Sequence, residues 1–170
     1  MIFLVKIVLV RNYSYNIRMD SLFFQYCPKI AVFSQDGSSV LLCRRKGEAD
    51  YDGVFSFIGG KMEHKDLSII DALSREKTEE VGELFRIKVL PHYSIDTFFV
   101  KKDGSRMILP HYYAVHQSGE INLSEEYDDY RWVPLNSLDE FEPKIENIAW
   151  IATLLSRAAT IAEDEDFVAV

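Results

Sequence analysis

The stretch 59–83 constrains this chain more than any other part of the sequence. It opens with a Gly-Gly pair directly after the apolar run 54–58, and apolar residues then recur at helical spacing. Ser68 can cap the start of a helix through its hydroxyl, and Gly82 suits the position just past a helix end. We therefore expect an extended segment, a glycine turn, and a helix between Ser68 and Gly82.

Three carboxylates fall on one face of that helix. Glu76 precedes Glu79 by three residues and Glu80 by four, and such spacings bring side chains together on a helix surface. Like charges so placed cost about 0.2–0.5 kcal/mol per pair, and acids near a helix C-terminus oppose its dipole. One interpretation is a solvated acidic face. The interpretation we prefer is a divalent-cation site, because Mg²⁺ favours carboxylate oxygens and bridges them to phosphates.

The whole stretch resembles the signature of the Nudix hydrolase family, whose MutT-like members carry G-x5-E-x7-R-E-U-x-E-E-x-G-U with U apolar. The R-E-x-x-E-E-x-G half is complete and in order, which makes the resemblance specific. The matching residues are Gly59, Gly60, Lys61, Glu63, Arg75, Glu76, Glu79, Glu80 and Gly82.

The chain departs from this signature in three places, the last of which is Glu83, where the family has an apolar residue. The acid expected six residues after the second Gly is Asp66, and eight residues instead of seven separate it from Arg75. We therefore expect one extra residue in this loop. Lys77 stands where the family has an apolar residue and shares the face of Leu73. Its stem should cover apolar surface while its ammonium group reaches outward.

The resemblance implies a metal-dependent hydrolytic site. The metal, Mg²⁺ with Mn²⁺ as the alternative, would be held by Glu76, Glu79, Glu80 and the carbonyl of Gly59. Glu76 is also the first candidate for the base that takes a proton from water. Arg75 completes the catalytic pair, with an orienting salt bridge as its implied role.

Other candidates lie at the margins of the signature or outside it. The family often adds a metal ligand or base from a loop before a late Trp strand. Glu126 is the best match and Glu125 the next, with a solvated loop as the alternative. Lys61 is a candidate phosphate contact. Arg44 and Arg45 are candidates too, because guanidinium groups suit phosphate oxygens, and two exposed surface arginines are the equal alternative.

The implied reaction is hydrolysis of the diphosphate linkage in a nucleoside diphosphate joined to another group. The residues after the signature, 95–100, carry neither the Pro nor the Tyr that marks two family subgroups. We expect a nucleoside triphosphate or a nucleotide sugar as substrate. The alternative function is a noncatalytic Nudix-like module that binds or senses a nucleotide.

The remaining pattern predicts an α/β fold. Hairpins are expected over 29–43 and 95–116, with a separate strand starting at 87–90, a short strand at 131–135 and an amphipathic helix over 143–162. The Nudix fold that the resemblance implies over 25–162 is an α/β/α sandwich with a mixed sheet between helices. The tail 163–170 is expected to fray.

We expect residues 19–170 to form a single Nudix domain. Residues 1–18 are either an extra strand or an extension upstream of a start at Met19; their apolar run is too short to span a bilayer. The net charge of −8 argues against nonspecific nucleic-acid binding. Cys27 and Cys43 show no metal or redox spacing and are expected as buried thiols. We expect a cytoplasmic monomer or homodimer without a membrane partner.

Overall fold

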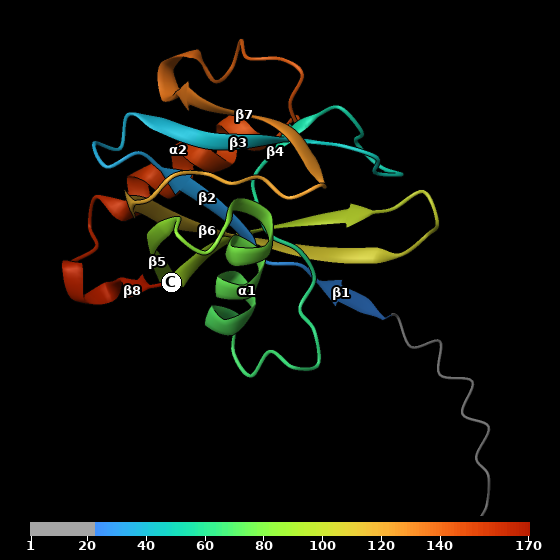
Figure 1. Ribbon diagram of the computed structural model, residues 1–170, viewed down its shortest axis with the longest axis horizontal. Helices are drawn as coiled ribbons and strands as arrows, with labels where there is room; N and C mark the ends of the chain where they lie inside the picture. The colour runs from blue at the N-terminus through green and yellow to red at the C-terminus, as the bar shows by residue number, and fades with distance from the viewer. Residues whose placement is uncertain (1–22) are drawn as a thin grey trace, which may run out of the picture.

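Figure 1 shows a computed structural model that describes residues 23–170. The expectations for 1–18 and for a start at Met19 lie outside these residues. Within them, none of the helices is long and apolar enough to cross a bilayer.

Eight strands of the described chain form one mixed sheet in the order β4-β3-β2-β6-β5-β8, with β1 paired to β6 and β7 paired to β3. The sheet is mixed because β2 runs parallel to β6 and antiparallel to β3. The strands are β1 (Phe24–Tyr26), β2 (Lys29–Phe33), β3 (Ser39–Arg45), β4 (Phe55–Ser56), β5 (Arg86–Val100), β6 (Arg106–Ser118), β7 (Tyr127–Pro134) and β8 (Val168–Ala169).

Both predicted hairpins are confirmed. In the β2–β3 turn, the Asp36 carboxylate accepts hydrogen bonds from the Ser34 hydroxyl and from the backbone of Ser38, at 2.5 and 3.1 Å. In the β5–β6 turn, Lys101 N–H donates to the Ser105 carbonyl at 2.9 Å. Asp, Ser and Gly make these turns because short polar side chains bond to the nearby backbone.

The signature helix is also confirmed, as α1 (Ile69–Val81). Its N-cap is Ser68, whose hydroxyl accepts from Asp71 N–H at 3.1 Å, and Gly82 follows its last turn. Lys77 lies on the core-facing side and is 1% exposed, so its ammonium group is covered as well as its stem. Burial lowers the pKa of that group.

The two long helices cover opposite faces of the sheet, which confirms the predicted α/β/α sandwich (Figure 1). Alternate residues of β2 divide between the two cores: Ile30 packs on the α1 side and Ala31 on the side of α2 (Ile148–Ala159). Strands buried on both faces read as continuous apolar runs, as β2 and β3 do.

Three predicted elements differ from the structure. The helix expected over 143–162 begins only at Ile148, because Pro143 and Ile145 form backbone hydrogen bonds with Phe55 of β4 instead. The strand expected to start at 87–90 and the one that begins the second hairpin are the single strand β5, with a bulge between Val89 and Ser94.

The tail prediction was wrong. Residues 163–166 form a turn in which Glu163 and Asp166 cap each other, and Lys88 pairs with Asp164 at 2.7 Å. The following strand β8 then pairs with the edge of β5. Backbone pairing to a sheet edge orders a terminus that local composition would leave free.

Candidate active site

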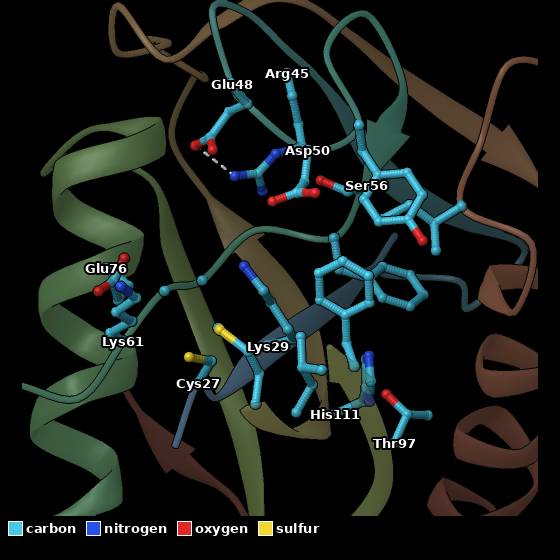
Figure 2. Close-up of a pocket in the computed structure, with 18 of the residues that line it drawn as sticks. Cys27, Lys29, Arg45, Glu48, Asp50, Ser56, Lys61, Glu76, Thr97 and His111 are labelled. Atoms are coloured by element: carbon cyan, nitrogen blue, oxygen red, sulfur yellow. Dashed lines mark hydrogen bonds and ion pairs between the residues drawn. The ribbon is translucent and has the colours of Figure 1, made fainter. Parts of the chain in front are cut away.

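A cavity of about 590 Å³ opens beside the Gly-Gly turn. Figure 2 shows Glu76 and Lys61 at one end, His111 and Thr97 at the other, and Lys29 between them. Cavities of roughly 300–1,000 Å³ hold small-molecule ligands, so this one is large enough for a nucleotide.

The Gly-Gly turn allows the backbone to approach the acids of α1. A Cβ atom on Gly60 would overlap the Glu76 carboxylate, and one on Gly59 would overlap the Pro28 carbonyl oxygen. Gly59 also has φ of 112°, which side chains other than glycine rarely adopt. Its N–H donates to the Glu80 carboxylate. The glycine pair is therefore required by two close contacts and one backbone conformation.

Glu80 is the most enclosed acid of the site, with 5% of its surface exposed. Its carboxylate accepts from Gly59 N–H and from the Tyr127 hydroxyl, the latter at 2.8 Å. Burial raises its pKa to about 7, although Lys29 and these two donors act in the opposite direction. Burial also raises the pKa of Glu76. Two acids on one helix thus lack enough positive charge around them.

Arg75 connects the acids of the site. It bonds Asp66 through two nitrogens at 3.1 and 3.0 Å, Glu76 at 2.7 Å and Glu79 at 2.9 Å. A further bond reaches the Lys61 carbonyl at 2.9 Å. These bonds occupy the planar guanidinium on every side, so it orients the carboxylates.

Asp66 reaches Arg75 despite the extra residue in the loop. Its side chain is 3% exposed and accepts from Glu63 N–H at 2.8 Å, which closes a tight turn. The extra residue between Asp66 and Arg75 therefore does not keep this carboxylate from the guanidinium group. Arg75 lowers the pKa of Asp66 through their hydrogen bonds.

The predicted metal ligands all line this cavity, but their side chains do not converge on one point. Glu76, Glu79, Glu80, Gly59 and Glu126 all line it, whereas Glu125 does not. The Glu79 side chain is 53% exposed and turns to Arg75. Over residues 23–170, no three acidic, histidine or cysteine side chains form a ready-made metal site.

Of the two candidate arginines, the structure brings only Arg45 to the cavity wall. Arg45 pairs with Glu48 at 2.5 Å. Arg44 pairs with Asp128 at 2.6 Å, lies over the Phe55 ring and does not line the cavity. Arg44 is therefore held by Asp128 away from the cavity that Arg45 lines.

Two lysines that sequence reasoning missed join Lys61 at the cavity wall: Lys29 and Lys101. None of the three has a carboxylate oxygen within 4.0 Å among the described residues. Burial lowers the pKa of Lys29. The sequence did hold a signal for Lys29, because it is a charged residue in an otherwise apolar strand.

His111 and Cys27 were also missed as wall residues. His111 is adjacent to Lys29 in the parallel β2–β6 register, so both side chains lie on one face of the sheet. Cys27 and Cys43 are free and buried, which confirms their prediction as thiols. Phe98 and Phe99 of β5 also line the cavity, whereas Tyr112 and Tyr113 of β6 do not.

Comparison with known proteins agrees with this geometry. The family model of the NUDIX domain matches residues 27–153. The chain is 31% identical over 124 residues to a nucleoside triphosphatase NudI of Escherichia fergusonii, a match that covers 68% of this chain and 84% of that protein. Its fold resembles that of a MutT protein from Methanosarcina mazei, with a TM-score of 0.64 and 19% identity over 80% of this chain and 95% of that one. It also resembles a NUDIX family hydrolase from Clostridium perfringens, with a TM-score of 0.65 and 19% identity over 81% of this chain and 99% of that one. The chain therefore belongs to the Nudix hydrolase family.

Proposed function

We propose that this pyrophosphohydrolase acts on nucleoside triphosphates with the help of Mg²⁺ or Mn²⁺. One observation carries the proposal: two buried carboxylates, Glu76 and Glu80, share a nucleotide-sized cavity with three lysines that have no acidic partner. The similarity to a nucleoside triphosphatase favours triphosphates over nucleotide sugars.

The cationic side chains explain how so acidic a protein can attract a triphosphate. The chain carries a net charge of −8, yet Lys29, Lys61, Lys101 and Arg45 line one cavity. Ammonium and guanidinium groups bind phosphate oxygens through charge-assisted hydrogen bonds. We assign phosphate binding to these four residues and leave Arg44 out.

The acids fit a divalent cation. Their oxygens are the hard ligands that Mg²⁺ prefers, and burial has raised the pKa of both Glu76 and Glu80, a cost that a cation would offset. In this proposal Glu76, Glu79, Glu80 and the Gly59 carbonyl would hold the metal, with Glu126, from the loop before β7, as a further ligand. A bound cation would supply charge neutralisation at the phosphate oxygens and acidity for a nearby water.

The protein groups then have separate tasks. Glu76 takes the proton of the water that attacks phosphorus in line. Arg75 holds Glu76 in place by their 2.7 Å bond. The lysines bind the phosphate oxygens on which charge increases as the bond to the leaving phosphate breaks.

The test is release of phosphate, pyrophosphate or monophosphate from a panel of nucleoside triphosphates and nucleotide sugars. It is run with Mg²⁺, with Mn²⁺ and with chelator, on the wild type, Glu76→Gln and Glu80→Gln. Glu83→Gln is a matched control, because Glu83 is exposed and does not line the cavity.

Metal-dependent turnover of triphosphates that both cavity variants lose, and the control keeps, is the expected result. Turnover of nucleotide sugars alone would move the substrate assignment to them. If no compound turned over while nucleotides raised the melting temperature, the chain would be a binding module and the catalytic proposal would be wrong.

A further inference from the structure

His111 lies at the end of the cavity farthest from the acids of α1 (Figure 2). It is 5% exposed, on β6, between Lys29 of β2 and Ile95 of β5. A triphosphate held between the lysines and the acids would direct its attached group toward this end. The chemistry of His111 therefore bears on what that group is.

The hydrogen bonding of the ring fixes its tautomer. The Nδ1 atom lies 2.8 Å from the Ile95 carbonyl oxygen. That oxygen can only accept, so Nδ1 carries the hydrogen and Nε2 presents a lone pair. Burial lowers the pKa of the imidazole to about 4, which keeps it neutral near pH 7. His111 is thus a rigid hydrogen-bond acceptor.

No donor of residues 23–170 bonds to Nε2, although the Leu109 carbonyl, an acceptor, also lies near the ring. The ring of Phe57 meets His111 edge-on, with 5.9 Å between centroids, and cannot donate a conventional hydrogen bond. Since the backbone of β5 holds the Nδ1 side, the Nε2 side is the one left for a ligand.

Aromatic side chains in the cavity wall suit a planar ring. Phe57 and Phe99 line the cavity, and Tyr51 packs on Phe99 with 5.4 Å between centroids. Tyr51 holds this place with φ of 60°, uncommon for a residue other than glycine. The Ser56 hydroxyl, elsewhere in the cavity wall, is buried and lacks a hydrogen-bond partner among residues 23–170. Apolar walls with a few fixed polar atoms are typical of sites for heteroaromatic groups.

We propose that His111 is a specificity-determining residue: its Nε2 accepts a hydrogen bond from an N–H group of the nucleobase on the triphosphate. The inference rests on the proposed function and deepens it, because it names the part of the substrate that this chain recognises. Substrates whose base can donate an N–H to Nε2 of His111 are preferred. Compounds without a base contact only the phosphate-binding residues.

The test compares His111→Leu, which removes the acceptor, with His111→Gln, which keeps an oxygen acceptor on a side chain of similar length. His92→Leu is the matched control, because His92 is exposed on β5 and does not line the cavity. The probes are a hydrolysed nucleoside triphosphate, its base-N-methylated analogue and inorganic tripolyphosphate. Melting temperatures verify that each variant is folded.

His111→Leu should lower kcat/KM for the nucleoside triphosphate by roughly 10–100-fold and leave tripolyphosphate unchanged, with partial recovery in His111→Gln. N-methylation of the base should reproduce the loss in the wild type and add nothing in His111→Leu. An equal loss of kcat/KM for the nucleoside triphosphate and for tripolyphosphate, or no loss for either, would overturn the inference while leaving the proposed function intact.

A binding readout separates the two hypotheses further. The Kd of a non-hydrolysable nucleoside triphosphate without metal should weaken in His111→Leu, and the ¹⁵N resonance of Nε2 should move when the base binds. An unmoved resonance with nucleotide bound would overturn the role of His111. Absence of turnover in the wild type, with the resonance shift present, would instead count against the proposed function alone.

Discussion

Replacing Glu80 by Gln should stabilise the metal-free protein at alkaline pH while abolishing turnover. Glu80 belongs to α1 and is buried, and burial raises its pKa from 4.5 to about 7. Glutamine has the same shape without the charge. Its carbonyl oxygen can accept from Gly59 N–H, and its amide can donate to the Tyr127 hydroxyl oxygen. Neither neighbour of Glu80 is then left without a partner.

The magnitude follows from linkage between proton binding and folding. The folded pKa of Glu80 lies above the unfolded value, so its contribution to stability is fully present below pH 4.5 and lost as the pH rises through about 7. The total loss is on the order of 3 kcal/mol, since each pKa unit corresponds to about 1.4 kcal/mol. Glu76 titrates in both proteins, so their difference isolates Glu80.

Thermal unfolding of both proteins with chelator, between pH 4.5 and 8.5, measures this difference. The melting temperatures should coincide near pH 4.5 and diverge by roughly 5–10 °C at pH 8.5 in favour of Glu80→Gln. At pH 8.5, Mg²⁺ should then raise the melting temperature of the wild type more than that of the variant. A variant less stable than the wild type at pH 8.5 would refute the reasoning, and Glu83→Gln should show no such divergence.

Three further substitutions test single contacts. Gly60→Ala should lower kcat roughly 10²-fold without unfolding the protein, because its Cβ displaces the Glu76 carboxylate; a normal kcat with an intact melting temperature would contradict this. Arg75→Lys should cost roughly 10–100-fold in kcat/KM, since an ammonium cannot bridge several acids at once, and steady-state kinetics would expose an error as unchanged activity. Lys29→Met should raise KM about 10–100-fold while Lys46→Met, an exposed control outside the cavity, leaves KM unchanged; equal KM values would remove Lys29 from phosphate binding.

Features encoded by near neighbours in the sequence were predictable. Ser68 caps α1 and Gly82 follows it, as their positions indicated. The turn at Asp36 closes through side-chain bonds to residues two positions away on either side. The Gly-Gly pair stands where two close contacts leave no room for a Cβ atom. Each depends on bonds within a few residues or on a sterically unique residue type, so a short stretch of sequence contains the information.

Other parts of the site were not predictable, because they depend on contacts between distant segments. Whether Asp66 could reach Arg75 across a longer loop depended on how that loop folds back on α1. Arg45 lines the cavity while Arg44 pairs with Asp128, and this difference depended on which face of β3 the cavity occupies. The order of the tail depended on the free edge of β5.

The sequence by itself determined the family, the signature helix with its caps and the acids that α1 presents. Only the tertiary structure decided which cations and which acceptor share the cavity with those acids. Lys29 and His111 lie far apart in the chain and become neighbours through the parallel register of β2 and β6. Local sequence specifies which face of a strand is apolar, but the pairing of strands is set by burial over the whole sheet, and no short pattern carries that information.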